Sequence, residues 1–380
     1  TSPRGFIDLL GAYKAGNLEL DKTAKDIFES CFLCTNCVEV CPKSLPTDMI
    51  IEQVRNDIAK KFGIAWYKKA FFALLRHRKL NDIAFKLGYT FQTCGFKIKE
   101  ETNSMNSRFS LPILKTERTL PSLSKTSFLN SHQENIDNGG KRKVAVFIGC
   151  LANYNYTDIG ESLLEILAAL NIDAFLAKDQ KCCSAPAYFT GDFDTVDSNA
   201  KHNIAYFESF SRDVEAIIVP EATCSAMLKI DYEHYFHDDP AWRARAQSIQ
   251  RKIFMATEWL QHHTELEQLL ASKKKDTKIV TYHDPCHARK MQGIHEEPRN
   301  LIRQNYKIVE MSDPNACCGF GGITMQSEKY HFAKAAGTPK AAMIAKTGAE
   351  IVSAECSACR MQINASMGYT DTKTVFKNPI

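Results

Sequence analysis

Short apolar runs recur along the chain from Lys141 onward, and each is followed by a longer stretch in which apolar residues have helical spacing. A run of about four to six apolar residues between turn signals predicts a buried strand. Such runs occupy residues 144–149, 172–176, 216–220, 278–282, 307–310 and 350–353. Strands that alternate with helices are typical of βαβ units, so we expect an α/β fold with parallel sheets here.

Residues before 141 show a different pattern. Residues 61–112 look helical, because large apolar residues recur there at helical spacing: Phe71, Phe72, Leu74, Leu75, Ile83 and Leu87. Residues 113–140 are rich in Ser, Pro, Asn and charge, which is typical of a linker. The basic amphipathic segment 66–79 is expected to pack its apolar face into the protein, with contact to an anionic membrane surface as the alternative.

Cysteines follow the predicted strands twice, in the same order. Equivalent cysteines are 136 residues apart (150 to 286), 135 apart (182 to 317) and 132 apart (224 to 356). Three nearly equal offsets indicate an internal duplication. In both halves the cysteines follow the carboxyl ends of strands, where open α/β sheets place their sites.

A further cysteine run lies near the start of the chain, with Cys31, Cys34, Cys37 and Cys41-Pro42 in CxxCxxCxxxCP spacing. Three cysteines on one short loop can reach different corners of a 4Fe–4S cubane, and the cysteine before proline ligates the other cluster in two-cluster ferredoxins. A zinc site is the alternative, but zinc needs no third interleaved cysteine. Because nothing before Cys31 supplies the missing ligands, we expect a second such motif upstream in the full-length protein.

The duplicated cysteines differ between the halves. The second half has Cys286, Cys317-Cys318 and Cys356-x-x-Cys359, whereas the first has Cys150, Cys182-Cys183 and Cys224 with Met227 in the last place. Adjacent cysteines suit a multi-iron unit, with structural zinc or buried thiols as alternatives. Thioether is the poorer ligand, so we expect the first-half cluster to differ in type or to be absent. Glycines 319, 321 and 322 allow the backbone to approach a cluster closely.

Composition narrows the class of protein. The 380 residues include fourteen cysteines, and free thiols at this density indicate a reducing compartment. A net charge of +4 and the lack of a recognisable motif argue against nucleic-acid binding. No apolar run reaches the roughly 18 residues of a membrane span. Without a flavin or nicotinamide fingerprint, the chain is not expected to be catalytic alone, and the catalytic residues stay unknown.

Three other residues carry weaker signals. His283 and His287 flank Cys286, and we expect them to support a cluster from outside its ligand set, or to have a merely structural role, rather than to ligate iron. Cys94 stands alone in the sequence and is expected to be a buried thiol.

These motifs resemble the duplicated CCG cysteine-rich domain of the heterodisulfide reductase catalytic subunit. The whole layout is similar to the iron–sulfur subunit of glycolate oxidase or D-lactate dehydrogenase. The resemblance implies a helical ferredoxin-type iron–sulfur module followed by two duplicated Rossmann-like CCG α/β domains. It also implies a noncubane iron–sulfur cluster in the second CCG domain, on Cys286, Cys317, Cys318, Cys356 and Cys359. The first half matches four of that set, with Cys150, Cys182, Cys183 and Cys224. Ser184 and Met227 depart from the pattern.

We therefore divide the chain into residues 1–60, the ferredoxin-type 4Fe–4S module, and 61–140, the helical segment and linker. Residues 141–272 form the first CCG domain and 273–380 the second. The metal ligands are expected to be Cys31, Cys34, Cys37, Cys41, Cys286, Cys317, Cys318, Cys356 and Cys359, and the cofactor-binding set adds Cys150, Cys182, Cys183 and Cys224.

The resemblance implies an electron-transfer subunit of an oxidoreductase complex. It would carry electrons from a FAD-containing dehydrogenase subunit that oxidises glycolate or D-lactate towards quinone or another membrane electron acceptor. A heterodisulfide-reductase-like disulfide reductase and the CCG subunit of a succinate or fumarate oxidoreductase are the alternatives. The expected location is cytoplasmic, with peripheral contact at the inner face of the cytoplasmic membrane as a further option.

Overall fold

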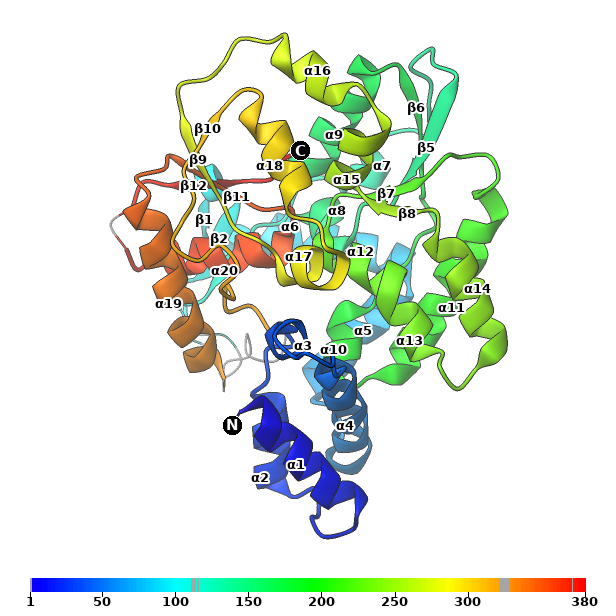
Figure 1. Ribbon diagram of the computed structural model, residues 1–380, viewed down its shortest axis with the longest axis vertical. Coiled ribbons are helices and arrows are strands. Elements are labelled where there is room, and N and C mark those ends of the chain that lie inside the picture. The colour runs from blue at the N-terminus through cyan, green and yellow to red at the C-terminus, as the bar shows by residue number, and fades with distance from the viewer. Residues whose placement is uncertain (1, 111–113, 115, 322–328, 371) are drawn as a thin grey trace.

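The N-terminal quarter of the chain is helical in the computed structural model, which describes residues 2–110, 114, 116–321, 329–370 and 372–380. Its helices are α1 (Pro3–Lys14), α2 (Lys22–Glu29), α3 (Asn36–Glu39), α4 (Thr47–Phe62), α5 (Trp66–Arg76) and α6 (Arg78–Gly95). Side-chain oxygens of Ser2 and Asp21 cap α1 and α2. α1, α2 and α4 pack together at one end of the molecule, the blue end in Figure 1.

The apolar spacing had suggested helix as far as residue 112, but residues 96–110 are not α-helical, and residues 111 and 112 lie outside the described part of the chain. Instead the segment after α6 forms an antiparallel sheet of β1 (Phe96–Lys99), β2 (Ser104–Ser107) and β3 (Thr119–Pro121), with the 3₁₀ turn η1 (Glu100–Thr102) between β1 and β2. The stretch with linker composition also contributes α7 (Phe128–Ser131) and β4 (Asn135–Ile136). Phe128 and Leu129 are fully buried in the core of the following α/β unit, so this stretch is part of that core.

The first half of the duplication is built on a five-stranded sheet of order β4-β6-β5-β7-β8, in which β4 is the antiparallel edge. The other strands are β5 (Arg142–Val146), β6 (Ile172–Leu176), β7 (Ile217–Val219) and β8 (Ile253–Met255). The helices are α8 (Cys150–Tyr154), α9 (Asp158–Ala169), α10 (Ala185–Thr190), α11 (Phe193–Phe210), α12 (Ala222–Ala226), the π-helical η2 (Met227–Asp231), α13 (Tyr232–Tyr235), α14 (Pro240–Gln250), α15 (Ala256–His263) and α16 (Leu266–Ala271).

The second half has a parallel sheet of order β10-β9-β11-β12. Its strands are β9 (Ile279–Tyr282), β10 (Lys307–Ile308), β11 (Ile351–Ser353) and β12 (Val375–Lys377), and its helices are α17 (Cys286–Gln292), α18 (Glu296–Arg303), α19 (Tyr330–Lys346) and α20 (Ser357–Met367). The α/β expectation is thus confirmed, and every predicted strand is present. β8 and β12, which close one edge of each sheet, were not predicted.

Two buried carboxylates join the halves. Glu221 lies two residues after β7 and accepts hydrogen bonds from the main-chain N–H (2.8 Å) and the hydroxyl of Ser357 at the start of α20. Glu355 lies two residues after β11 and accepts from the N–H (3.3 Å) and the hydroxyl of Thr257 in α15. Burial raises the pKa of Glu221 to about 7 and that of Glu355 to about 8. We call this pair the carboxylate clasp.

Within the part of the chain that the structure describes, every helix is too short or too polar to cross a bilayer.

Candidate metal centres

The second-half cysteines converge at the carboxyl ends of β9, β10 and β11. Cys286 begins α17, Cys317 and Cys318 lie on the loop after β10, and Cys356 is the residue before α20. The Sγ atoms of Cys318 and Cys359 are 3.4 Å apart, and the N–H of Cys359 donates to Cys356 Sγ at 3.4 Å. Hydrogen bonds from the Cys317 and Cys359 thiols lower the pKa of Cys318 to about 5. Five thiols from three loops therefore gather at this edge of the sheet, and those of Cys318 and Cys359 are in contact.

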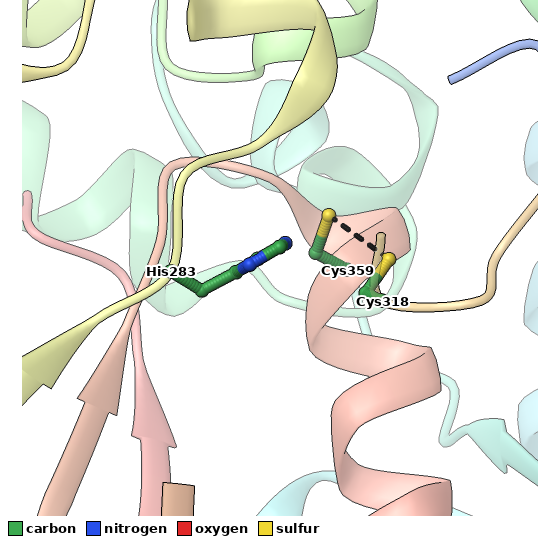
Figure 2. Close-up of side chains that lie close together, drawn as sticks. All are labelled: His283, Cys318 and Cys359. Atoms are coloured by element: carbon green, nitrogen blue, oxygen red, sulfur yellow. Dashed lines mark hydrogen bonds between the residues drawn. The ribbon is translucent and has the colours of Figure 1, made fainter. Parts of the chain in front are cut away.

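His283 adds a nitrogen to this group. Its ligand atom lies within 4.8 Å of the thiols of Cys318 and Cys359, and its ring points toward them (Figure 2). Burial lowers the pKa of His283 to about 3, so the ring is neutral. Nδ1 is 3.2 Å from the carbonyl of Pro314, which only accepts, so Nδ1 holds the proton and buried Nε2 keeps a lone pair without a partner. A buried nitrogen without a hydrogen-bond partner, beside two thiols, fits a metal ligand. This observation favours ligation by His283 more strongly than the sequence had suggested.

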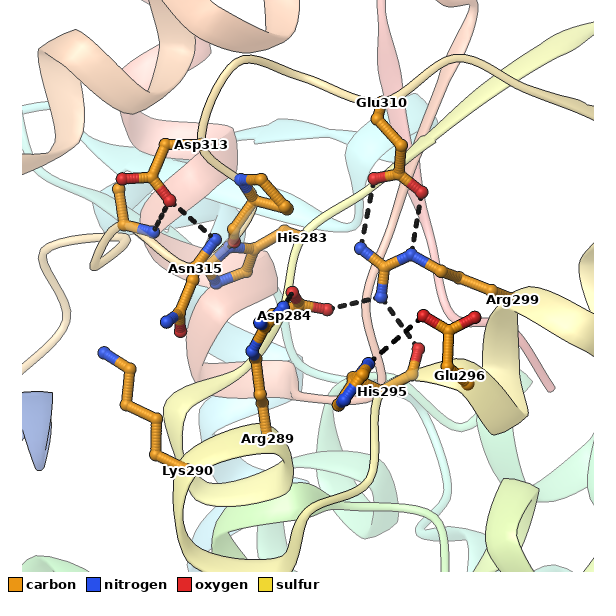
Figure 3. A network of polar contacts seen from close by, with 12 residues as sticks. His283, Asp284, Arg289, Lys290, His295, Glu296, Arg299, Glu310, Asp313 and Asn315 are labelled. Atoms are coloured by element: carbon orange, nitrogen blue, oxygen red, sulfur yellow. Dashed lines mark hydrogen bonds and ion pairs between the residues drawn. The ribbon is translucent and has the colours of Figure 1, made fainter. Parts of the chain in front are cut away.

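A network of charged groups fixes the loop that carries His283. Asp284 accepts from Arg289 at 2.5 Å and from Arg299 at 2.6 Å, and Arg299 also donates to Glu310 at 2.7 Å (Figure 3). Burial opposes ionisation of Asp284, but the two guanidinium groups hold its pKa below the usual value. Asp284, which lies between His283 and Cys286 in the loop from β9 to α17, is therefore bound by two arginines. These bonds keep His283 and Cys286 in place.

The first-half cysteines repeat the arrangement at the ends of β5, β6 and β7. The Sγ atoms of Cys183 and Cys224 are 3.3 Å apart, and Cys150 and Cys182 are within hydrogen-bonding distance. A Cβ on Gly149 (φ +74°) would come within 3.0 Å of Cys224 Sγ, so glycine is needed there. Met227 is fully buried in η2. Four thiols are thus brought together in this half.

The residue after each Cys-Cys pair shows how closely the duplicated loops agree. Gly319 has φ +94° and donates its N–H to Cys317 Sγ at 3.3 Å. Its counterpart Ser184 adopts φ +75° and donates to Cys182 Sγ at 3.4 Å, so the left-handed turn persists without glycine. Main-chain N–H donation to a cysteine sulfur thus occurs in both halves. Gly322 lies outside the described residues.

The N-terminal cysteines lie on the loop around α3. Leu33 (φ +52°) donates its N–H to Cys31 Sγ at 3.4 Å, and the thiol of Cys37 is within hydrogen-bonding distance of Thr47. Cys41 takes its hydrogen bonds from the backbone N–H groups of residues 45, 43 and 44, which lower its pKa. Burial raises the pKa of Cys31 to about 11, because its thiolate would lie away from water.

The three thiol groups lie in a series. The thiol of Cys34 is within hydrogen-bonding distance of that of Cys317, which joins the N-terminal loop to the second-half group. Asn36 and Glu39 of α3 dock there, on Lys290 (3.2 Å) and Asn315 (3.0 Å). The second-half and first-half groups meet where Thr223 Oγ1, one residue before Cys224, lies 3.7 Å from Cys356 Sγ.

The structure also corrects one expectation and shows residues that sequence reasoning missed. Cys94 is exposed near the end of α6, so the prediction of a buried thiol is wrong. Arg55 was not singled out, although it is buried and donates to the Cys31 carbonyl at 2.6 Å. The clasp residues Glu221 and Glu355 were also missed. Superposing the two sequence halves on their third strands would have revealed an acid at the same place in both.

Comparisons with known proteins agree with this arrangement. The CCG cysteine-rich domain model matches residues 144–229 and 280–364. The probable glycolate oxidase iron–sulfur subunit of Bacillus subtilis is 29% identical over 332 residues, 85% of this chain and 73% of that protein. Lactate utilization protein A of Bacillus velezensis is 30% identical over 232 residues, 60% of this chain and 93% of that protein. A subunit of the fumarate reductase (CoM/CoB) of Methanothermobacter marburgensis is 27% identical over 371 residues, 94% of this chain; the match spans 62% of that longer protein.

Proposed function

Because this chain belongs to the CCG cysteine-rich family of iron–sulfur proteins, we propose that it is the electron-transfer subunit of a 2-hydroxy-acid dehydrogenase complex. A FAD-containing subunit oxidises glycolate or D-lactate, and this chain passes the electrons towards quinone. The similarity to the glycolate oxidase iron–sulfur subunit and to lactate utilization protein A supports the substrate class. The flavin chemistry belongs to the partner, so this chain alone does not oxidise either acid.

The contact between Cys34 and Cys317 is the observation that carries this proposal. It supports a ferredoxin-type 4Fe–4S cluster, held by Cys31, Cys34 and Cys37, directly beside the second-half group. Cys41 serves a second ferredoxin-type cluster. When bound, the clusters accept and release single electrons, and the chain positions them. Electrons would then cross from the ferredoxin module to the second half and, past Thr223, to the first half.

The thiols also support the cluster types. Cys286, Cys317, Cys318, Cys356 and Cys359, with His283 beside them, offer more ligand atoms than one tetrahedral zinc can use. We therefore propose a noncubane-type cluster in the second half. The first half offers four thiols, Cys150, Cys182, Cys183 and Cys224, for a cluster of a different type.

The test combines metal analysis with turnover. Protein reconstituted anaerobically should bind iron and acid-labile sulfide, and with the flavoprotein it should reduce a quinone analogue when glycolate or D-lactate is supplied. A colourless protein that takes up zinc stoichiometrically would refute the cluster assignment. Oxidation of either acid by the isolated chain would refute its role as a carrier.

Membership of a fumarate oxidoreductase is the second candidate, because the similarity to the Methanothermobacter marburgensis fumarate reductase protein covers 94% of this chain. The same preparation distinguishes the two roles. Reduced protein that is reoxidised by fumarate in the presence of a flavoprotein, but not by a quinone analogue, would favour the second candidate.

A further inference from the structure

The outward face of α6 is apolar. Leu80, Ile83, Leu87 and Phe91 are 54%, 57%, 56% and 64% exposed. Because they recur every three or four residues, they form one continuous stripe along the helix, which we call the α6 stripe. Of the eleven large hydrophobic side chains that are exposed in the described part of the chain, eight lie between residues 62 and 109, so the apolar surface is concentrated here.

The polar face of α6 is the one that faces the protein. Asn81 and Gln92 are buried, and the Gln92 amide bonds to both main-chain groups of Leu123 at 3.0 and 3.3 Å. Asp82 accepts from Tyr154 at 2.6 Å, and Phe85 stacks on the same tyrosine with ring centroids 4.2 Å apart. These contacts fix the rotation of the helix. The apolar stripe therefore faces outward because the opposite face is held by specific bonds, the reverse of an ordinary surface helix.

The segment of the chain that carries the stripe is strongly basic. Residues 58–99 contain ten Lys and Arg residues and one acid, Asp82, a net charge of +9. Since the whole chain carries +4, the remaining residues carry −5. Asp82 is neutralised by Arg78 at 3.1 Å, and the exposed Lys79 and Lys86 lie along one edge of the stripe. An apolar stripe bordered by lysines, in a segment this basic, complements a surface that is apolar beneath and anionic on top.

We propose that the α6 stripe docks this protein on an anionic membrane surface. The helix would lie in the plane of the interface, with its leucine, isoleucine and phenylalanine side chains among the acyl chains and Lys79 and Lys86 among the headgroups. The docking itself does not depend on the proposed function. It rests on that function only for its purpose, which is to bring the clusters to a lipid-soluble acceptor.

The position of the stripe suits that purpose. α6 begins at Arg78, whose positive charge acts on the first-half thiol of Cys150 and whose guanidinium donates to the Lys178 carbonyl at 3.2 Å. The first-half thiol group, the last in the series that begins at Cys34, therefore lies close to the start of the docking helix.

Vesicle flotation with the cluster-loaded protein tests the proposal. The vesicles contain phosphatidylcholine alone, or phosphatidylcholine with about one third phosphatidylglycerol. We expect binding to the anionic vesicles that weakens as salt is added. Lys79→Gln/Lys86→Gln should weaken partitioning roughly 25-fold at low salt. Leu80→Asn/Leu87→Asn should weaken it roughly tenfold for each leucine. The matched control, Lys273→Gln/Lys274→Gln, removes the same charge from an exposed loop and should bind almost as the parent does.

A second measurement shows which surface enters the bilayer. Cys94 is exposed and follows Phe91 by three residues, so a polarity-sensitive dye on this thiol should shift to shorter emission wavelength on anionic vesicles. Unchanged visible absorbance of the clusters in each variant shows that the fold is intact. Binding that both double variants leave unchanged would overturn the proposal. The proposal would also be overturned if the parent protein did not bind vesicles and the leucine variant no longer bound the flavoprotein, because the stripe would then dock a protein. Neither result would bear on electron transfer to a soluble quinone analogue.

Discussion

Arg55 is the residue whose loss should reveal how the ferredoxin module is held on the rest of the protein. The side chain is 1% exposed and donates four hydrogen bonds to three main-chain carbonyls. Two go to Phe28 at 3.3 and 3.0 Å, one to Cys31 at 2.6 Å and one to Phe189 at 2.9 Å. The guanidinium thus caps the end of α2, holds the first cysteine of the motif and reaches α10 of the first half.

Replacing Arg55 by methionine keeps much of the volume and removes every donor. An unpaired buried carbonyl costs about 1–3 kcal/mol. Part of this is offset, because the variant no longer buries a charged group. We therefore expect Arg55→Met to lower the free energy of unfolding by about 3 kcal/mol. The Cys31 carbonyl loses its donor, so the cluster that we propose on Cys31, Cys34 and Cys37 should also be lost more readily than the one proposed in the second half.

The assay combines urea unfolding with iron content and electron paramagnetic resonance on the same samples. Arg245→Met is the matched control, because Arg245 makes a half-exposed ion pair with Glu208 at 2.5 Å that should contribute less than about 1 kcal/mol. Equal urea midpoints for the two variants would refute the reasoning. So would an Arg55→Met protein in which the second-half signal disappears before the ferredoxin-type signal.

Three further expectations follow from the sites. Cys317→Ser, beside Cys34, should leave the ferredoxin-type cluster reducible by the flavoprotein while the second half stays oxidised in freeze-quenched resonance spectra; parallel reduction of both would contradict the series. His283→Leu should remove a nitrogen coupling from the second-half resonance signal, and a coupling that survives would exclude Nε2 as its source. Burial raises the pKa of Asp231 to about 7, and its Oδ2 has no hydrogen-bond partner, so the folded state resists ionisation. The carboxyl group binds its proton more tightly in the folded state, so the stability of the protein falls as pH rises towards 7. In urea unfolding, Asp231→Asn should therefore stabilise the protein by about 2 kcal/mol more at pH 8.5 than at pH 5.5. An equal gain at the two pH values would show that Asp231 is ionised throughout.

The elements that could be predicted from sequence are those with a local signal. The run at 172–176 coincides with β6, and both cysteine sets fall at strand ends as expected. β8 and β12 were not predicted, and they are formed by pairing with β7 and β11. The sequence had no way to show this pairing.

The orientation of α6 could not be predicted for a related reason. Apolar spacing identified the helix, and the usual rule turns such a face inward. Phe72 and Leu75 of α5 follow the rule and are buried, whereas Ile83 and Leu87 of α6 do not. The contacts that fix the orientation join residues far apart in the sequence, such as Asp82 and Tyr154, which are 72 residues apart, and no pattern along the helix reveals them. The series of thiol groups depends on similar distant contacts, such as that of Cys34 with Cys317.

The carboxylate clasp bears on how this protein could have diverged after its duplication. Glu221 satisfies the start of α20 in the second half, and Glu355 satisfies the start of α15 in the first. In each copy, an acid of the other copy therefore supplies part of the capping of one helix. A substitution of either acid therefore affects the opposite copy, so the two copies cannot accumulate substitutions as independently as two separate genes would. Separation of the copies onto two chains would require both acids to find new partners at once.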